Sequence, residues 1–266
     1  MNKFLLGTAL VALGTLSAQA ADLAVRRAPV SYPPVEQPYY WSGFYIGGNA
    51  GYTWSNQNGV DLLPTSGGPV DILGPGQLAN SIDFSRNGFI GGGQIGYNWQ
   101  FANWLVGFET DFQGTTVNSS ALVHTNAAPL FPVDNSVSSR LDYFGTVRGR
   151  IGLLPQANWL VFLTGGLAYG EVNNSATVFD FGGNGVAPIS WSGSSRTTQT
   201  GWTLGGGTEW AFMRNWSAKV EYLYYDLGKT NVTMSQVAGD PAFAGTLNAR
   251  FANSGSIVRG GINYHF

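Results

Sequence analysis

The sequence predicts an all-β protein, an eight-stranded antiparallel up-and-down transmembrane β-barrel. Charged residues make up only 11% of the chain and aromatic residues 14%, whereas a soluble domain carries about 25% charged residues. The chain begins with an export signal, and no later run of 18 apolar residues could form a transmembrane helix. Eight segments alternate apolar and polar residues, and the connections between them alternate between short and long. A closed barrel crosses a bilayer without helices because neighbouring strands satisfy each other's backbone groups.

The first 20 residues read as a secretory signal peptide. Lys3 supplies the positive charge, an apolar run follows to Leu16, and Ala18 and Ala20 flank a small-residue cleavage motif. Cleavage would remove one of the 13 basic residues and leave 12 against 15 acidic residues, a net charge of −3. Residues 21–40 are rich in proline and predict an extended periplasmic linker. Residues 41–266 remain for the outer-membrane β-barrel.

The composition also limits the partners. The chain lacks cysteine, so an exported protein of this length is predicted to hold together without disulfides or thiolate metal sites. It shows no stripe of basic residues, and we therefore expect no nucleic-acid partner.

Eight segments have the period-2 alternation of strands. Each is long enough to cross a bilayer as a tilted strand, which takes about 9–11 residues. Their approximate ranges are 42–54, 87–101, 104–116, 140–154, 159–172, 199–212, 216–228 and 251–266.

The connections predict the orientation. Three of them contain only a few residues, whereas the other four are long and rich in loop-forming residues, at 55–86, 117–139, 173–198 and 229–250. Short periplasmic turns and long outer loops are typical of outer-membrane barrels, with both termini in the periplasm. A soluble lipocalin-like barrel also has eight strands. The loop lengths alone therefore do not distinguish a membrane barrel from a soluble one.

Tryptophan residues recur at one end of the segments. Each short turn ends in Asn-Trp, which places three Trp residues at the same height. We interpret these and three further residues as an aromatic girdle at the membrane interface, where the ring lies in the apolar layer and the N–H near water. The predicted girdle contains Trp41, Trp99, Trp104, Trp159, Trp210 and Trp216.

The charged residues distinguish the two faces of each segment. In segment 140–154 we expect Leu141 and Tyr143 to face lipid, and Asp142, Arg148 and Arg150 to face the lumen. A lipid-facing Arg or Lys at the midplane costs about 2–4 kcal/mol, and a one-residue slip would move a whole strand's side chains to the other face. The charges in these segments are therefore predicted to point inwards.

Four acidic and four basic residues then share a narrow lumen. An eight-stranded barrel is just wide enough for side chains to fill its interior, and an unpaired buried ion costs several kcal/mol. We expect a salt-bridged network that largely closes the lumen; an ion or proton path is the alternative. The predicted network contains Glu109, Asp111, Arg148, Arg150, Glu209, Lys219, Glu221 and Arg259.

The chain ends in a strand, "GGINYHF", with Ile262, Tyr264 and Phe266 on its apolar face. A terminal Phe with aromatic residues at alternate positions resembles the signal by which the outer-membrane barrel-assembly machinery recognises its substrates. "YYWSGFYIGGNAGY" and "LDYFGTVRGRIG" resemble the porin-like outer-membrane proteins of alphaproteobacteria, often called outer-membrane immunogenic proteins. That resemblance covers about residues 41–266 and implies a barrel similar to the OmpA transmembrane domain.

A site for chemistry finds little support in the sequence. The two histidines, His124 and His265, are far apart, and we expect no metal, no cofactor and no catalytic residue. A nucleophile–base pair would require His124 to face a serine such as Ser119, Ser120 or Ser138. Some relatives within the resembled family are proposed to bind haem, and His124 would then be the candidate ligand.

The expected protein is therefore a structural, surface-exposed, monomeric barrel of the cell outer membrane, and not an enzyme. Its expected partners are the outer-membrane lipids and, through the C-terminal strand, the assembly machinery; an extracellular partner is not indicated. A narrow diffusion pore is the alternative, and a ligand binder or enzyme acting through the outer loops is a further one.

Overall fold

The computed structural model describes residues 39–56, 59–67, 73, 77–126, 131–183, 185 and 187–266. The predicted signal peptide and nearly all of the predicted linker lie outside the described residues. The described part contains one short 3₁₀ helix, η1 (Pro241–Phe243), and no helix in it is long and apolar enough to cross a membrane.

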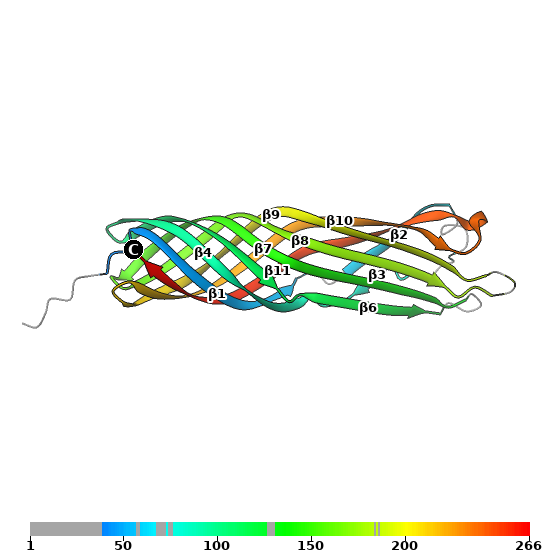
Figure 1. The fold of residues 1–266 in the computed structure, drawn as a ribbon, viewed down its shortest axis with the longest axis horizontal. Coiled ribbons are helices and arrows are strands. Elements are labelled where there is room, and N and C mark those ends of the chain that lie inside the picture. Colours follow the sequence, from blue (N-terminus) through cyan, green and yellow to red (C-terminus); the bar gives the residue numbers. More distant parts are fainter. Residues whose placement is uncertain are drawn as a thin grey trace, which may run out of the picture. The chain divides into compact units, whose positions relative to one another are not determined.

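Eleven strands form the described part of the fold (Figure 1). Three are short and eight are longer. The short strands are β2 (Gly59–Gly67), β3 (Ser81–Asp83) and β6 (Asn118–Thr125). The longer ones are β1 (Gly43–Ser55), β4 (Asn87–Phe101), β5 (Trp104–Thr115), β7 (Val133–Gln156), β8 (Trp159–Asp180), β9 (Ile189–Met213), β10 (Trp216–Ala238) and β11 (Gly245–His265).

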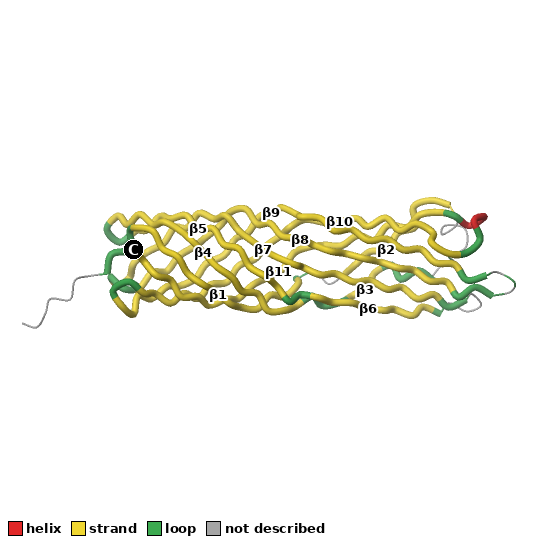
Figure 2. The backbone as a smooth tube through the Cα atoms, in the orientation of Figure 1, coloured by secondary structure: helices red, strands yellow, loops and turns green. Residues whose placement is uncertain are grey.

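The eight longer strands pair antiparallel in the order β1-β4-β5-β7-β8-β9-β10-β11. A further pairing between β1 and β11, from Tyr45 with His265 to Ser55 with Gly255, closes the sheet on itself. The three short strands lie off this ring: β6 pairs with β7, β2 with β11, and β3 with β2 (Figure 2). The fold is thus an all-β antiparallel barrel with additional strands at one end.

The expectation that residues 117–139, 173–198 and 229–250 are loops is wrong. Most of these residues continue the strands, and β7 to β11 reach 21 to 25 residues each. The pairs Ser138–Ser175 and Thr177–Ser192, joined by hydroxyl hydrogen bonds of 2.8 and 3.1 Å, show why. Serine, threonine and asparagine read as loop residues in the sequence, but here they form polar outer rows on strands that bury apolar residues on the other face.

The short turns agree with the sequence. Residues 102–103, 157–158 and 214–215 join β4 to β5, β7 to β8 and β9 to β10. The turn at Ala102 adopts a positive φ of 53°, which is uncommon for a residue with a side chain. All three turns lie at the same end of the ring, the end that carries the C-terminus in Figure 1.

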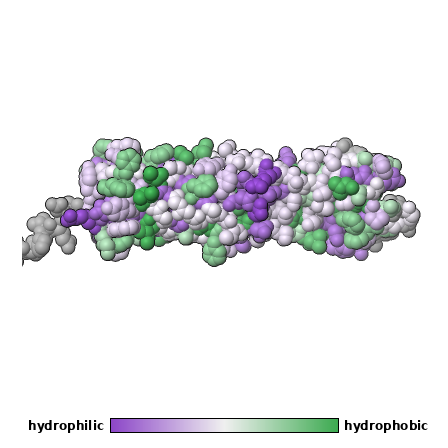
Figure 3. Space-filling view, viewed as in Figure 1, coloured by the Kyte–Doolittle hydropathy of each residue, from purple (hydrophilic) through white to green (hydrophobic). Residues whose placement is uncertain are grey.

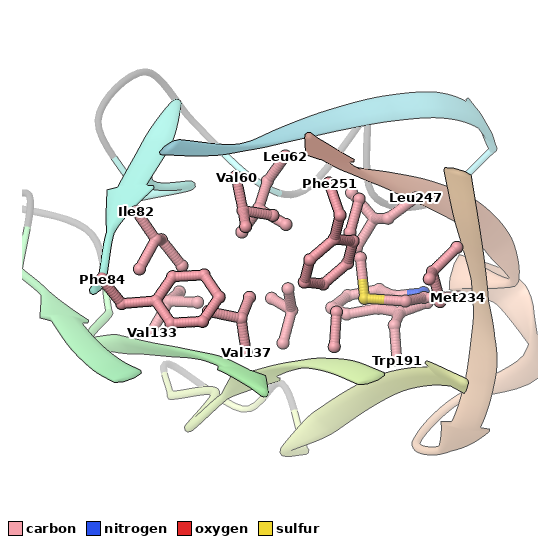
Figure 4. Close-up of a cluster of buried hydrophobic side chains, with 14 of the residues drawn as sticks. Val60, Leu62, Ile82, Phe84, Val133, Val137, Trp191, Met234, Leu247 and Phe251 are labelled. Carbon is pink, nitrogen blue, oxygen red and sulfur yellow. The ribbon is translucent and has the colours of Figure 1, made fainter. Parts of the chain in front are cut away.

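The interior is built in layers, which can be followed along the inward face of β7. Leu154 belongs to an apolar cluster with Trp41, Leu105, Leu160, Phe162 and Ala211. Arg150 and Arg148 come next, then Phe144 and Leu141 in a second apolar cluster, and Val137 and Val133 in a third. The third cluster gathers side chains from the short strands as well as the long ones, pointing toward one another (Figure 4). Charged residues are therefore enclosed between apolar layers.

Candidate functional site

The structure buries all eight residues of the predicted charge network on the inner face of the ring. Each is at most 3% exposed. They come from β5, β7, β9, β10 and β11, and cross-strand register brings several together: Glu109 lies opposite Arg148, Lys219 opposite Glu209, and Glu221 opposite Arg259. The network forms because these strands close into a ring.

Arg148 and Lys219 connect the network around Glu109 and Glu221. Arg148 contacts three carboxylates, at 2.5 Å for Glu109, 3.1 Å for Asp111 and 2.9 Å for Glu221. Lys219 lies 2.8 Å from Glu109 and 2.9 Å from Glu221. Every carboxylate that Arg148 touches also has a second cation. The loss of one pair would leave those carboxylates still compensated.

Arg259 provides the remaining compensation on this side. Its Nη2 lies 2.7 Å from Asp111 and its Nε 2.9 Å from Glu221. Asp111 and Glu221 therefore each contact both Arg148 and Arg259, so that acidic and basic groups alternate in this part of the network.

Arg150 and Glu209 form a second part of the network. Arg150 Nη1 lies 3.1 Å from Glu209 and 3.7 Å from Glu109. Its guanidinium carbon lies 4.8 Å from the ring centre of Tyr45 and 5.4 Å from that of Phe162, within the range of cation–π contacts. A ring nitrogen of His265 lies 3.4 Å from Glu209, and Lys219 occupies the opposite position on β10, but among the described residues Arg150 is the one arginine or lysine within 4 Å of this carboxylate. Glu209 thus depends on one arginine more than any other carboxylate of the network does.

Neutral polar side chains complete the hydrogen bonding of the carboxylates, and the sequence reasoning missed them. Tyr45 Oη donates to Glu109 at 2.7 Å, and Thr146 Oγ1 to Asp111 at 2.7 Å. Ser217 and Asn263 donate to Glu209 at 2.5 and 2.6 Å. All four occupy inward positions of their strands. Their inward orientation could be read from the alternation in the sequence, but the carboxylate that each one contacts depends on how the neighbouring strands are aligned.

A small cavity lies beyond the charged layer. It has a volume of about 30 Å³ and is lined by side chains that include Ser139, Tyr225, Leu227, Asn253 and Ser254. A space of this size holds about one water molecule. Its apolar lining, which includes Tyr225 and Leu227, belongs to the second apolar cluster.

At the short-turn end of the barrel, the structure contradicts one residue of the predicted girdle. Trp41 does not face lipid; it is fully buried under the ring. Its Nε1 donates to the carbonyl of Ala157 at 2.9 Å, and its ring contacts those of Tyr39 and His265. The residue precedes β1, so the alternation that places strand residues on one face does not apply to it. Burial also raises the pKa of Tyr39 above its ordinary value.

The other five predicted girdle residues lie on the outer surface near the turn end of the ring. Trp99, Trp104, Trp159, Trp210 and Trp216 are all exposed on the outer face. In Figure 3, hydrophobic residues gather over this part of the surface, and a strongly hydrophilic patch lies further along. An outer belt of this kind suits the contact with hydrocarbon and its interface.

The predicted face of two residues in β7, Leu141 and Asp142, is wrong, whereas Tyr143 lies outside as predicted. Leu141 is buried inside, and Asp142 lies on the outer face, where it contacts Arg140 Nε at 2.6 Å. The pairing of β7 with β8 shifts between Leu141 and Phe144. This irregularity reverses the alternation, so that Tyr143 and Asp142 both lie outside.

The C-terminal strand places its predicted assembly residues outward. Ile262 and Phe266 are exposed, and the Tyr264 ring lies between the rings of Trp216 and Phe266, 5.2 Å from each. His124, the residue considered for haem or hydrolysis, lies on β6 and hydrogen-bonds Asp134 across the strand pair at 2.6 Å. Among the described residues, no group of three His, Cys, Asp or Glu side chains is arranged to hold a metal.

Known proteins share this sequence pattern. The model of a family described as outer membrane protein beta-barrel domain matches residues 8–252. The 31 kDa outer-membrane immunogenic protein of Brucella melitensis is 40% identical over 86% of this chain and 89% of its own length. The 22 kDa outer membrane protein of Rhizobium leguminosarum is 28% identical over 73% of this chain and 67% of its own length.

Solved structures are more distant. The outer membrane protein OprG of Pseudomonas aeruginosa is 13% identical, with 86% of this chain and 99% of that one covered and a TM-score of 0.43. For Neisserial surface protein A the identity is 15%, the coverage 85% and 98%, and the TM-score 0.34. These likenesses are too remote to bear on function. The family match and the Brucella relative, in contrast, are close enough to show the family. The chain is an outer-membrane protein and belongs to the outer membrane protein beta-barrel domain family, among the alphaproteobacterial outer-membrane immunogenic proteins.

Proposed function

We propose that this protein is a structural, surface-exposed component of the outer membrane, an eight-stranded transmembrane barrel whose lumen is closed. The observation that carries the proposal is the buried network of four acidic and four basic residues, in which each charged group contacts at least one opposite charge. Charges arranged in this way hold one another in place, and an ion crossing the layer would have to displace them.

The layers on either side support a closed lumen. Trp41, Leu105 and Leu160 cover the charged layer on the side of the short turns. Phe144, Leu223 and Ile257 cover it on the other side. A diffusing solute would have to pass two apolar layers as well as the charges, whereas a water-filled pore has a polar interior.

The strand lengths support a surface-exposed role. A tilted strand crosses a bilayer with about 9–11 residues, and β7 to β11 have 21 to 25. With the short turns in the periplasm, about half of each of these strands would project beyond the outer leaflet. The third apolar cluster would stabilise this projecting part, which has no bilayer around it.

Conductance tests this function. Purified, refolded protein inserted into a planar lipid bilayer should conduct weakly or not at all. The variant Arg148→Ala with Arg150→Ala should conduct more and favour cations, because two long cationic side chains are gone and the remaining excess charge in the lumen is acidic. Wild-type protein that conducts steadily at the level of an open pore would favour the diffusion-pore alternative.

A further inference from the structure

The outer face of the barrel carries a cluster of four charged residues that has no part in the lumen. Asp142 lies outside because of the irregularity in β7, and it contacts Arg140 through Nε at 2.6 Å and Nη2 at 3.3 Å. On the neighbouring strands, Arg196 Nε donates to Glu171, and Arg196 Nη2 lies 3.7 Å from Asp142. The cluster therefore joins β7, β8 and β9.

The cations of the cluster are the accessible members. The side chains of Arg196 and Arg140 are 63% and 47% exposed, whereas those of Asp142 and Glu171 are 24% and 18% exposed. Surface ion pairs of this kind contribute little stability by themselves. The carboxylates orient the guanidinium groups through Nε and Nη2 of each arginine, and among the described residues neither Nη1 donates a hydrogen bond to a carboxylate. Each arginine therefore keeps donors for another ligand.

The height of the cluster along the strands is the second observation. On β8, the outward residues from Trp159 to Tyr169 include Val161, Leu163 and Leu167, and Glu171 follows them. On β7, the outward apolar residues Leu153, Ile151 and Val147 lie nearer the short turns, and Tyr143 and Asp142 lie further from them. Ten residues of tilted strand match the hydrocarbon core of a bilayer. With the short turns in the periplasm, as in the function proposed above, the cluster lies where the headgroups of the outer leaflet begin.

Arg140 and Arg196 are also spaced for one ligand. Register places Asn173 of β8 opposite both of them. Strands are about 4.8 Å apart, so the two arginine Cα atoms are separated by about 10 Å, a distance that two long side chains can close around a single phosphate. The next outward row along the same strands, Ser138, Ser175 and Ser194, offers hydroxyl groups.

We propose that Arg140 and Arg196 form a binding site for the phosphorylated saccharide headgroup of an outer-leaflet glycolipid. Arginine suits phosphate because its planar fork donates two parallel hydrogen bonds. Asn173 and the serine row would contact sugar hydroxyl groups beside the phosphate. The proposal commits to a lipid of the same membrane, since the cluster directly adjoins the apolar belt.

Binding of lipid A, a diphosphorylated disaccharide lipid, to refolded protein in neutral detergent micelles tests the site. Native mass spectrometry would measure the lipid that remains bound. Wild type should retain lipid A, and Arg140→Gln with Arg196→Gln should bind it at least tenfold more weakly. Lipid A without its phosphates should bind the wild type as weakly as that variant binds the intact lipid.

A matched control removes the same charge elsewhere. Arg214 lies in a short turn, and Arg250 lies on β11, where it hydrogen-bonds Asn231 instead of a carboxylate. The variant Arg214→Gln with Arg250→Gln should bind lipid A like the wild type. An equal loss in this control would show that net charge alone attracts the lipid, and it would overturn the site.

Two further outcomes decide the proposal. Full retention of lipid A by the Arg140 and Arg196 variant would refute it, and so would equally tight binding of glucose 1-phosphate by the wild type, since the ligand would then be a free phosphate. If the Gln variant does not fold, Arg140→Lys with Arg196→Lys keeps both charges and loses only the planar fork; it should bind severalfold more weakly, and unchanged affinity would again refute the site. None of these results depends on whether the lumen conducts.

Discussion

Arg148 and Arg150, two of the arginines in the lumen, should differ in their contribution to stability. Replacing Arg150 by Met removes the guanidinium that lies 3.1 Å from Glu209. That buried carboxylate then keeps His265, Ser217 and Asn263 as direct partners, and Lys219 acts on it only from the opposite strand position. Replacing Arg148 by Met removes more ion pairs, but each of its three carboxylate partners keeps Lys219 or Arg259. Arg148 therefore makes more ion pairs than Arg150, but the loss of Arg150 is expected to cost more stability.

The magnitudes follow from this difference. Breaking a buried ion pair from one side costs about 3–5 kcal/mol when the remaining charge is uncompensated, and Glu209 in Arg150→Met is close to this situation because it loses its one direct arginine partner. A lost hydrogen bond to a charged group costs about 1.5–3 kcal/mol, which is closer to the situation in Arg148→Met. We expect the free energy of unfolding to fall more in the Arg150 variant than in the Arg148 variant.

A second substitution tests the reason. Glu209→Gln removes the charge that has lost its direct arginine partner and keeps an oxygen that can accept from Ser217 and Asn263. Arg150→Met with Glu209→Gln should therefore be more stable than Arg150→Met alone. This rescue separates the cost of a buried charge from the cost of lost packing against Tyr45 and Phe162, which the second substitution does not restore.

Urea unfolding in detergent micelles, followed by tryptophan fluorescence, would measure the three variants, with the midpoint and slope extrapolated to water. An Arg148 variant that is less stable than the Arg150 variant would refute this account of Glu209. So would a double variant that is no more stable than Arg150→Met.

Three other predictions concern topology, assembly and packing. A cysteine introduced at Ser66 should react with a membrane-impermeant label on intact cells, whereas one at Asn158 should not; the opposite pattern would reverse the orientation. Deleting Phe266 should lower the amount of folded protein in the outer membrane, measured by the difference in gel migration between unboiled and boiled samples; undiminished folding would show that the terminal residue is not needed as a signal. Gly92→Ala should cost about 1–3 kcal/mol, because the added Cβ would lie 2.1 Å from the Phe112 carbonyl oxygen, whereas Gly114→Ala, with nothing within 4 Å, should be nearly neutral; equal unfolding midpoints for the two variants would contradict this.

The sequence was informative wherever the bilayer restricts the chain. Lys219 and Glu221 could be assigned to the lumen because a charge at the other phase would face hydrocarbon. The short turns could be located because each contains only a few polar residues between two apolar alternations. Neither inference needed any knowledge of which strands are neighbours.

Further from the short turns the same reasoning fails. Ser138 and Ser175 lie on long strands, but their outer rows are polar, and polar rows of this kind read as loops in the sequence. Asp142 was assigned to the wrong face because the irregularity in β7 leaves no mark in the alternation. Trp41 was misplaced for a related reason: it lies before the first strand, where a tryptophan can cap an interior instead of facing an interface.

The pairing of β1 with β11 has a consequence for how the protein is made. Tyr45 and His265 come from opposite ends of the barrel sequence and must meet before the sheet closes. Contacts so distant along the chain make folding slow, because the entropy of closing the loop is lost before the contacts form. A chain that lacks its last strand would also present two unpaired edges, which hydrocarbon cannot tolerate. Synthesis of β11 is therefore the earliest point at which stable insertion can occur, and until then the exported polypeptide must be kept from aggregating in water.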